Sequence, residues 1–359
     1  MKFVKFFVLA LAALAFIGCG EETPQGVVPT GDAVLTANNN SVEVNTPIEF
    51  TVTSADGTDL TAQATIYDKS HDYVVVENPF TPTMDGEYEF YAVAGKIITP
   101  SIKVNVVPTV PALPEDEQPE NTVFNHRLLL VDHTGNTCGF CPQMMLALKE
   151  VAETGDYHSK YYEAMAHSYA ASDPAYSAAA AAISSHHGVN NYPTLTYNFF
   201  HDTASDRNAA HIMGQIDALW KAEGADAGIA AAATIASTSV VVNTEVKAAV
   251  ANDYRITAWL LEDGIEASQL NATQDWMNIH NNAIRQRVDC ESLSGVDLGT
   301  IAEGETASTA LTLKLIGNKW VRENLKVMVI VSAKNAKGKF DVVNVTICPM
   351  NDVVTYDYK

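Results

Sequence analysis

Two cysteines, Cys138 and Cys141, stand two residues apart in the stretch TGNTCGFCP, in a chain of 359 residues with five cysteines. A pair with this spacing can cycle between dithiol and disulfide, can be an inert structural disulfide, or can supply half of a zinc site. Zinc is the weakest hypothesis, because no second CxxC or close Cys–His pair completes four ligands. We therefore predict no metal and no cofactor, and a redox-active dithiol and an inert disulfide remain as alternatives.

The residues on either side of the pair suggest how its thiols would work. The apolar run HRLLLVD is typical of a buried strand and ends at Asp132, and a helical pattern begins at or near Cys138. A thiolate at a helix N-terminus has a lowered pKa, so Cys138 is the expected nucleophile and Cys141 the resolving thiol. Asp132 either accepts the Cys141 proton through water or caps a turn at the end of the strand.

Two segments of this region carry a family resemblance. LLLVDHTGNTCGFC resembles the active-site segment of thioredoxin-fold proteins, in which an Asp stands six residues before the first Cys, as Asp132 does here. GVNNYPTL resembles the second signature of that family, a loop with a cis-proline, and Pro193 takes its place. The resemblance implies that Pro193 faces the cysteine pair as part of a catalytic site, and that Tyr192, Thr194 and Phe140 bind substrate.

The first residues form a targeting segment. Two lysines precede an apolar run over residues 6–17, which is long enough for a signal peptide and too short to span a bilayer. The sequence FIGC that ends this run resembles a bacterial lipobox, and it implies a lipid on Cys19. We predict a signal peptide over 1–18 and a lipidated tether over 19–26. The acidic residues after Cys19 resemble the surface-export signal of Bacteroidota lipoproteins, so the expected location is the outer membrane, on a face that stays open.

Charge and compartment restrict the partners and the cysteine pairing. The formal net charge of −21 excludes nucleic acid as a partner, because an acidic surface repels phosphates. Outside the cytoplasm disulfides persist. With Cys19 lipidated, four cysteines allow three pairings, of which we favour Cys138–Cys141 with Cys290–Cys348. The second pair is expected to be a structural staple between strands.

The spacing at which apolar residues recur changes along the rest of the chain and divides it into regions of different predicted structure. Alternating apolar and polar residues predict an immunoglobulin-like β domain over 27–107, and a Pro- and acid-rich linker follows over 108–121. Strand and helix patterns alternate over 122–225, where we expect a thioredoxin-like α/β domain, and β patterns return over 226–359 as a β-sandwich. The predicted fold class is multidomain α+β.

The order of these features carries a wider resemblance. The lipobox, the TGxxCGxCP stretch, the YPT loop and the motif IHNNAIR over 279–285 resemble the Bacteroidota outer-membrane lipoproteins related to "outer-membrane protein twenty-eight". Two functions remain open. One is thiol–disulfide exchange on extracytoplasmic protein thiols and disulfides. The other is surface binding or adhesion on an inactive thioredoxin-like scaffold. The sequence does not predict the oligomeric state.

Overall fold

A computed structural model describes residues 31–199, 201–204, 206–315 and 320–359, without the side chains of 201–204. The predicted signal peptide, the tether and Cys19 lie outside the described residues. The described residues are 44% strand and 14% helix. They form two compact units, residues 31–38, 49–80 and 89–103 in the first and 39–48, 81–88 and 104–359 in the second.

The first unit consists of antiparallel strands. One pair joins two strands whose inward residues are buried, β1 (Ala33–Ala37) and β3 (Phe50–Ser54). The remaining strands lie side by side in the order β5 (Val74–Val76), β4 (Ala64–Asp68), β6 (Gly86–Ala94) and β7 (Ile97–Ile98). Alternate side chains of β6 are buried, as expected for strands with one face on the core.

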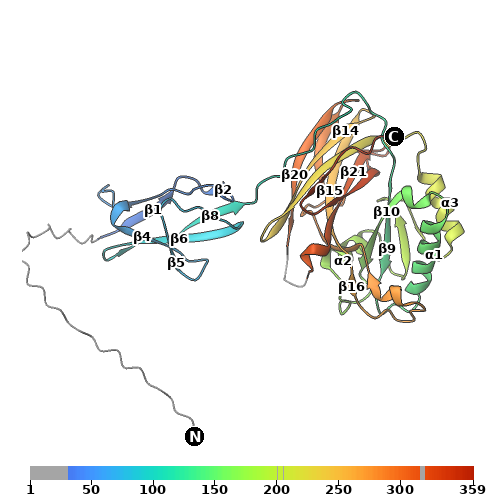
Figure 1. The fold of residues 1–359 in the computed structure, drawn as a ribbon, viewed down its shortest axis with the longest axis horizontal. Helices are drawn as coiled ribbons and strands as arrows, with labels where there is room; N and C mark the ends of the chain where they lie inside the picture. The colour runs from blue at the N-terminus through green and yellow to red at the C-terminus, as the bar shows by residue number, and fades with distance from the viewer. Residues whose placement is uncertain (1–30, 200, 205, 316–319) are drawn as a thin grey trace, which may run out of the picture. The chain divides into compact units, whose positions relative to one another are not determined.

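The second unit has one large sheet and one smaller sheet (Figure 1). The large sheet has nine strands, β12 (His201–Ala204), β11 (Thr194–Tyr197), β9 (Leu128–Thr134), β10 (Tyr161–His167), β18 (Ala283–Arg287), β15 (Asn252–Glu262), β21 (Leu325–Lys334) and β22 (Phe340–Pro349) in order, with β19 (Val296–Ile301) on β15. The smaller sheet has the order β20 (Thr306–Lys314), β14 (Ser239–Ala248), β13 (Ala227–Ile235) and β23 (Asp352–Val354).

Short elements complete this unit. Two strands pair in a small hairpin, β16 (Ile265–Glu266) and β17 (Ile279–His280). Strand β2 (Ser41–Glu43) runs parallel to the end of β8 (Ile102–Val107). The described residues contain three α-helices, α1 (Cys141–Glu153), α2 (Ala178–His186) and α3 (Ala209–Leu219). Within the described part of the chain, no helix is long and apolar enough to cross a membrane.

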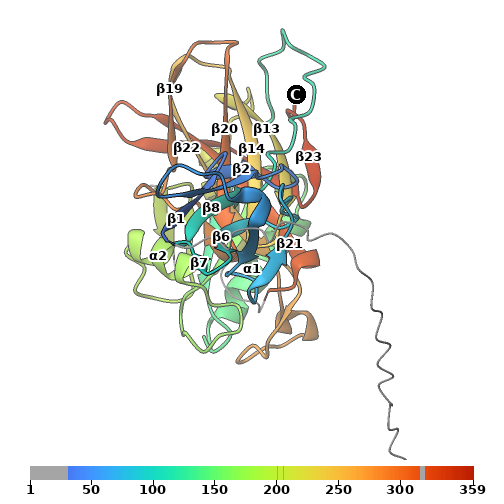
Figure 2. The same cartoon turned by 90° about the vertical axis from the view of Figure 1, so that its left-hand side faces the viewer.

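Helices cover both faces of the large sheet where it includes β9. Leu128 and Leu130 on one face of β9 pack in a cluster with residues of α1 and α3. Leu129 and Val131 on the other face pack in a cluster with residues of α2. Figure 1 shows these helices around the β9–β10 part of the molecule, and Figure 2 shows α1 and α2 from another side. A strand that is buried on both faces has apolar residues at successive positions. For this reason apolar and polar residues do not alternate in HRLLLVD.

The predicted fold class, with a central thioredoxin-like α/β domain between two sandwiches, is wrong. Strand β10 runs parallel to β18 with Met165 opposite Ala283, and the Met165 N–H donates to Asn282 O at 2.8 Å. Strands from 122–225 and from 226–359 are therefore neighbours in one sheet, and the described chain is rich in β-sheet. The apolar pattern that predicts a strand is set by the residues of that strand. Which strand pairs with it depends on residues more than a hundred positions away in the sequence.

One hydrophobic core extends across this junction. Leu129, Ala164 and Ile183 pack in the same buried cluster as Trp259 and Met328 from the later strands. The β9–β10 segment without these partners would expose apolar side chains to water, at a cost of roughly 25 cal/mol per Å². The two predicted regions therefore stabilise each other.

The Pro- and acid-rich segment over 108–121 makes fixed contacts that its composition did not predict. Lys247 on β14 is buried, and its ammonium group donates to Asp116 at 3.0 Å, to the carbonyl oxygen of Pro119 and to the hydroxyl of Tyr358 at 3.1 Å. The Tyr358 hydroxyl also donates to Asp116. This cluster holds the segment to the smaller sheet.

Lys247→Met tests this attachment. The substitution keeps the aliphatic stem but removes the ammonium group from Asp116, which retains only the Tyr358 hydroxyl and the Gln118 N–H as donors, and from the carbonyl oxygen of Pro119. We therefore expect a loss of about 2 kcal/mol in the free energy of unfolding. Urea denaturation measures it. The matched control is Lys149→Met, which removes an exposed i,i+4 pair with Glu153 and should change stability by about 0.5 kcal/mol. Equal effects of the two substitutions would contradict this role of Lys247.

Candidate functional site

Asp132 is fully buried near the end of β9, opposite Met165 on β10 and Leu195 on β11. Neither carboxyl oxygen has a hydrogen-bond partner. Burial, with a smaller contribution from Glu163, raises the pKa of Asp132 well above its usual value of 3.8. A neutral carboxyl group costs less to bury than a carboxylate, so the protonated form is favoured in the fold.

The loop after β9 leads directly into the cysteine pair. Gly135 must be a glycine here, because a Cβ atom would lie 2.6 Å from the Cβ of Tyr169. Cys138 and Cys141 form a disulfide, and their side chains are 2% and 0% exposed. Helix α1 begins at Cys141, so Cys138 lies in the turn before the helix rather than at its first position.

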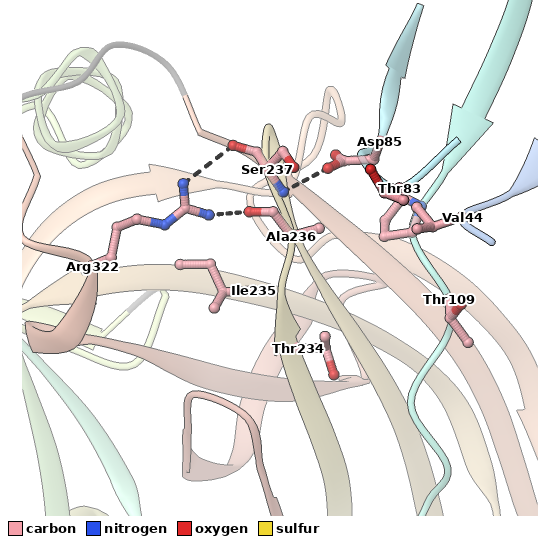
Figure 3. Close-up of a pocket in the computed structure, with 10 residues that line it drawn as sticks. Val44, Thr83, Asp85, Thr109, Thr234, Ile235, Ala236, Ser237 and Arg322 are labelled. Carbon is pink, nitrogen blue, oxygen red and sulfur yellow. Dashed lines mark hydrogen bonds between the residues drawn. The ribbon is translucent and has the colours of Figure 1, made fainter. Parts of the chain in front are cut away.

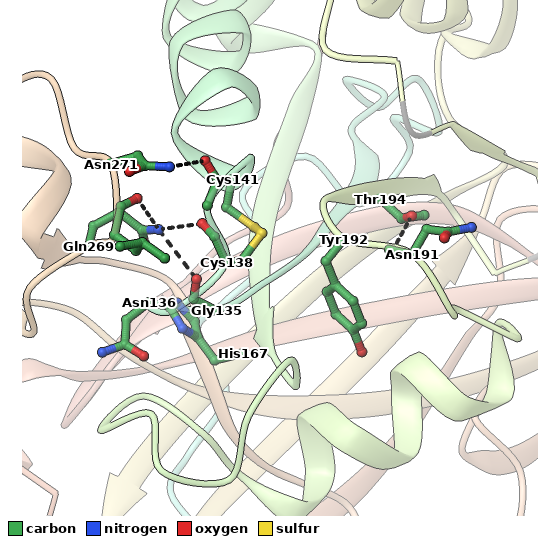
Figure 4. Close-up of a disulfide and its surroundings, with 12 residues drawn as sticks. Gly135, Asn136, Cys138, Cys141, His167, Asn191, Tyr192, Thr194, Gln269 and Asn271 are labelled. Atoms are coloured by element: carbon green, nitrogen blue, oxygen red, sulfur yellow. Dashed lines mark hydrogen bonds between the residues drawn. A yellow bond between two sulfur atoms is a disulfide. The ribbon is translucent and has the colours of Figure 1, made fainter.

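The second predicted loop lies beside the pair. The Tyr192–Pro193 peptide bond is cis, as the sequence predicts, and Pro193 is buried. Thr194 begins β11, and its hydroxyl donates to Asn191 O at 2.8 Å. The Tyr192 hydroxyl contacts Ser168 Oγ at 3.1 Å. In Figure 4, Tyr192 and Thr194 lie on the opposite side of the disulfide from Gln269 and Asn271.

Residues 268–271, which we call the covering segment, lie against the cysteine loop. The side-chain amide of Gln269 donates to Cys138 O at 3.0 Å, and that of Asn271 donates to Gly139 O at 3.1 Å (Figure 4). The Leu270 N–H donates to Asn136 O at 2.7 Å. Sequence reasoning missed this segment because it lies some 130 residues after the cysteines and carries no motif.

A buried polar cluster supports the same loops. Asp173 accepts hydrogen bonds from His167 Nδ1 at 2.8 Å and from the N–H of Asn136 at 2.7 Å. The His167 ring packs edge-on against His280, and His280 Nε2 contacts Ala267 O at 3.1 Å. Burial alone would raise the pKa of Asp173, but its hydrogen bonds, led by that of His167, lower it. The cluster links the end of β10 to the cysteine loop and to the residue just before the covering segment.

The predicted staple between Cys290 and Cys348 is wrong, since both cysteines are free thiols. Cys348 lies on β22, and three steps across the sheet lead from it to β18. The paired residues along this path are Val327 on β21, Leu260 on β15 and Gln286 on β18. Three strand spacings are about 14 Å, and Cys290 lies beyond the end of β18. Bridged cysteines have Cα atoms within about 7 Å of each other, so this arrangement does not place the two thiols for a bond.

A separate pocket of about 630 Å³ brings together none of the predicted site residues (Figure 3). The Asp85 carboxylate on its wall accepts a hydrogen bond from the Ser237 N–H at 2.6 Å and others from Thr238. Arg322 donates to the carbonyl oxygens of Ala236 and Ser237. These polar groups are paired with each other, so the cysteine region remains the candidate site. Nor do the described residues contain a cluster of His, Cys, Asp or Glu that could hold a metal ion.

The sequence between α2 and the end of β22 matches a protein family. The model of that family, described as outer membrane protein Omp28, matches residues 180–351. Residues 180–351 of this chain are similar to the Omp28 outer membrane proteins. The predicted location at the outer membrane or cell surface is confirmed, whereas the match starts after Cys141 and says nothing about the disulfide. A search of curated proteins found no match.

Solved structures add a likeness of fold. HBP35 of Porphyromonas gingivalis is similar with a TM-score of 0.52 and 15% identity, over 64% of this chain and 77% of that one. At this identity the likeness concerns the fold alone. Domains 4–9 of the surface layer protein SbsC give a TM-score of 0.19 and 10% identity, over 89% of this chain and 50% of that one, which is too low to support an argument.

The pH dependence of stability tests the state of Asp132. Because its pKa is raised, the folded chain holds this proton more tightly than the unfolded chain does. The contribution of Asp132 to the unfolding free energy should therefore fall as pH rises above about 4, through the pKa of the folded state. We expect Asp132→Asn, which cannot ionise, to remove this contribution, so that the difference in unfolding free energy between wild type and variant changes with pH in urea denaturation between pH 4 and neutrality.

Asp173→Asn is the matched control, because the pKa of Asp173 is lowered and its contribution to stability changes with pH in the opposite direction. A lowered pKa stabilises the fold above the unfolded pKa and loses that effect as pH falls. This substitution should reduce stability at neutral pH, and its effect should shrink in acid. Glu163, whose pKa burial raises to about 7, leaves a slope of its own in the variant, so the outcome that would contradict a protonated Asp132 is a difference between wild type and Asp132→Asn that does not change with pH.

Proposed function

We propose that this outer-membrane or cell-surface protein is a binding protein, and that the Cys138–Cys141 disulfide fastens the loops of its binding surface. The observation that carries the proposal is the burial of both cysteines in a loop whose carbonyl oxygens accept hydrogen bonds from the covering segment. Disulfide exchange requires an attacking sulfur to reach the bond, so a closed pair suits a structural role.

Four loops form the proposed surface, and they are residues 135–140, 168–173, 190–193 and 268–279. They contact one another. The Asn136 N–H donates to Asp173, the Tyr169 and Tyr192 rings meet edge-on at 5.2 Å, and Leu270 pairs with Asn136. The first two loops follow the parallel strands β9 and β10, and loops at the carboxyl ends of such strands commonly bind ligands.

The chemistry of the four-loop surface indicates a protein partner. Phe140 is 61% exposed and Leu270 is 51% exposed, and further exposed apolar side chains are those of Tyr169, Trp276 and Ile279. The four loops contain only two charged residues, Asp173 and Asp275, in a chain of net charge −21, and Asp173 is buried. Exposed aromatic groups without charge are typical of the centre of a protein interface. The expected partner is an apolar, weakly charged protein segment.

Selection from a displayed library of random peptides tests the surface. The wild-type chain should enrich apolar peptides with little charge, and the double variant Phe140→Ser with Leu270→Ser should lose them. Val353→Ser is the control, because it removes an exposed valine from β23, far from the four loops in sequence. Failure to enrich any peptide, or equal enrichment on the double variant, would contradict the proposed surface.

One observation favours thiol–disulfide exchange as a second candidate function. Asp132 is a buried carboxyl group without a partner, six residues before Cys138, and such a protonated group can give its proton to a thiolate and take it back. In that reaction a two-electron reductant such as an external thiol first opens the disulfide, and Cys138 then attacks a substrate disulfide and releases one thiolate. Cys141 then attacks the mixed disulfide, which re-forms the Cys138–Cys141 bond and releases the second thiolate. The buried disulfide would first have to become accessible.

Reduction by glutathione distinguishes the two functions. We expect the disulfide of the folded wild type to resist reduced glutathione, as measured by alkylation of freed thiols and mass spectrometry. Gln269→Ala should speed reduction because it removes the side chain that donates to Cys138 O. Gln274→Ala is the matched control, since this exposed glutamine contacts Trp276 instead. A wild-type disulfide that equilibrates rapidly with glutathione would overturn the structural role.

A further inference from the structure

A row of polar side chains runs from the four-loop surface into the core of the second unit, and we call it the polar network. It starts at Tyr192, whose hydroxyl contacts Ser168 Oγ at 3.1 Å and whose side chain extends away from the disulfide in Figure 4. Ser168 Oγ lies 2.6 Å from Ser184 Oγ on α2, and Ser184 Oγ lies 2.7 Å from His133 Nδ1 on β9. His133 Nε2 lies 3.1 Å from Thr196 Oγ1 on β11. Hydrogen-bond distances therefore connect the surface to two buried strands.

The inner part of the polar network is closed off from water. His133 and Thr196 are fully buried, and Ser184 is almost so. Each of their hydrogens therefore needs an acceptor within the protein. Burial, with a smaller contribution from the nearby His187, lowers the pKa of His133 to about 3. The imidazole is neutral at physiological pH, so only one of its ring nitrogens carries a hydrogen.

One direction of hydrogen bonding uses every contact of the polar network. If His133 Nδ1 carries the hydrogen, it donates to Ser184, and Nε2 accepts from the hydroxyl of Thr196. Ser184 then donates to Ser168, and Ser168 donates to the carbonyl oxygen of Ala166 at 3.2 Å. If Nε2 carried the hydrogen instead, the buried hydroxyl of Thr196 would have no acceptor among the residues that the structure describes. An unsatisfied buried donor is costly, so the first direction is favoured.

This direction fixes what the Tyr192 hydroxyl does. The hydrogen of Ser168 is used on the carbonyl oxygen of Ala166, so the contact between Ser168 and Tyr192 requires the phenol to donate. A hydroxyl oxygen can accept two hydrogen bonds, so Ser168 accepts from Tyr192 as well as from Ser184. The Tyr192 hydroxyl is therefore held from the inside of the protein.

We propose that the polar network positions Tyr192 for the partner of the four-loop surface. The positioning residues are Thr196, His133 and Ser184, which act on Tyr192 through Ser168. This inference rests on the proposed binding function and adds to it the groups that prepare the surface for binding.

The aromatic pair at the surface explains what this positioning achieves. The Tyr192 ring meets the ring of Tyr169, which is exposed, edge-on at 5.2 Å. A side chain that is already held in its bound orientation loses little conformational entropy when a partner binds, which strengthens binding. Rigid tyrosine rings are common contact groups in binding surfaces for this reason.

The tautomer of His133 tests the polar network in the unaltered protein. In nitrogen NMR spectra of the full chain labelled with ¹⁵N at histidine, we expect Nδ1 of His133 to carry the hydrogen and Nε2 to carry none. Because the pKa of His133 is lowered to about 3, this state should persist from about pH 8 down to about pH 5, where an unperturbed histidine is charged. A His133 ring with its hydrogen on Nε2, or one that becomes protonated in this range, would overturn the proposal.

Thr196→Val tests whether the buried end of the polar network reaches the surface. Valine has the shape of threonine without the hydroxyl, so His133 Nε2 loses its donor. We expect peptides selected by the wild type to bind about fivefold more weakly, which corresponds to the loss of one neutral hydrogen bond. The matched control is Thr257→Val, because Thr257 is a buried threonine of β15 whose hydroxyl has no hydrogen-bond partner among the described residues. Urea denaturation establishes that both variants are folded, and equal affinities of the two would contradict the proposed role.

A double-mutant cycle distinguishes positioning from a general loss of stability. Tyr192→Phe keeps the ring and removes the hydroxyl that ends the polar network, so it should weaken binding by a similar factor. Combined with Thr196→Val it should cause little further loss, because both substitutions act on the same network. Additive losses would contradict the proposal.

One measurement separates a failure of this inference from a failure of the binding function. A wild type that selects no peptide would contradict the binding function. The nuclear Overhauser effect between the rings of Tyr169 and Tyr192 tests the polar network in either case. We expect the effect to weaken in folded Thr196→Val and to be unchanged in Thr257→Val. An effect that is unchanged in Thr196→Val would overturn the positioning role.

Discussion

The parallel pairing of β10 with β18 is the contact on which the rest of the second unit depends. It joins the strands before and after residue 226 into one sheet, with Met165 opposite Ala283. It also determines what lies over the cysteines, because β18 begins four residues after the four-loop surface ends at residue 279. Once β18 is docked beside β10, the preceding hairpin is held at the end of β9 and β10, where the disulfide lies.

This arrangement changes the chemistry that a CxxC pair can perform. The sulfur atoms are buried, and amide groups from the covering segment bond to the carbonyl oxygens of the cysteine loop. Around them the loops expose apolar rings and almost no charge, although the chain as a whole is strongly acidic. A buried disulfide below a largely apolar surface, on which Arg207 lies 5.2 Å from the centre of the Phe140 ring, supports the proposed binding role better than electron transfer.

The sequence predicted the local features of the site and missed the long-range ones. The apolar run before Asp132, the helix after Cys141 and the cis-proline at Pro193 follow from residue type and spacing within short segments. The neighbour of β10, the cover over the disulfide and the separation of Cys290 from Cys348 depend on contacts between distant residues. Such contacts are chosen by burial and strand register across the whole core, which no single segment encodes.

The chain from β9 to α3 completes its core only with the later strands, which supply part of the same buried cluster. Residues 122–225 produced alone, with the Cys138–Cys141 disulfide intact, test it most directly by circular dichroism and urea denaturation. Without Trp259, Met328 and their neighbours, Leu129 and Val131 lose their packing partners. We expect this fragment to show no cooperative unfolding transition. A fragment that unfolds cooperatively, with native-like near-ultraviolet dichroism, would be an independent domain whose core does not need the later strands.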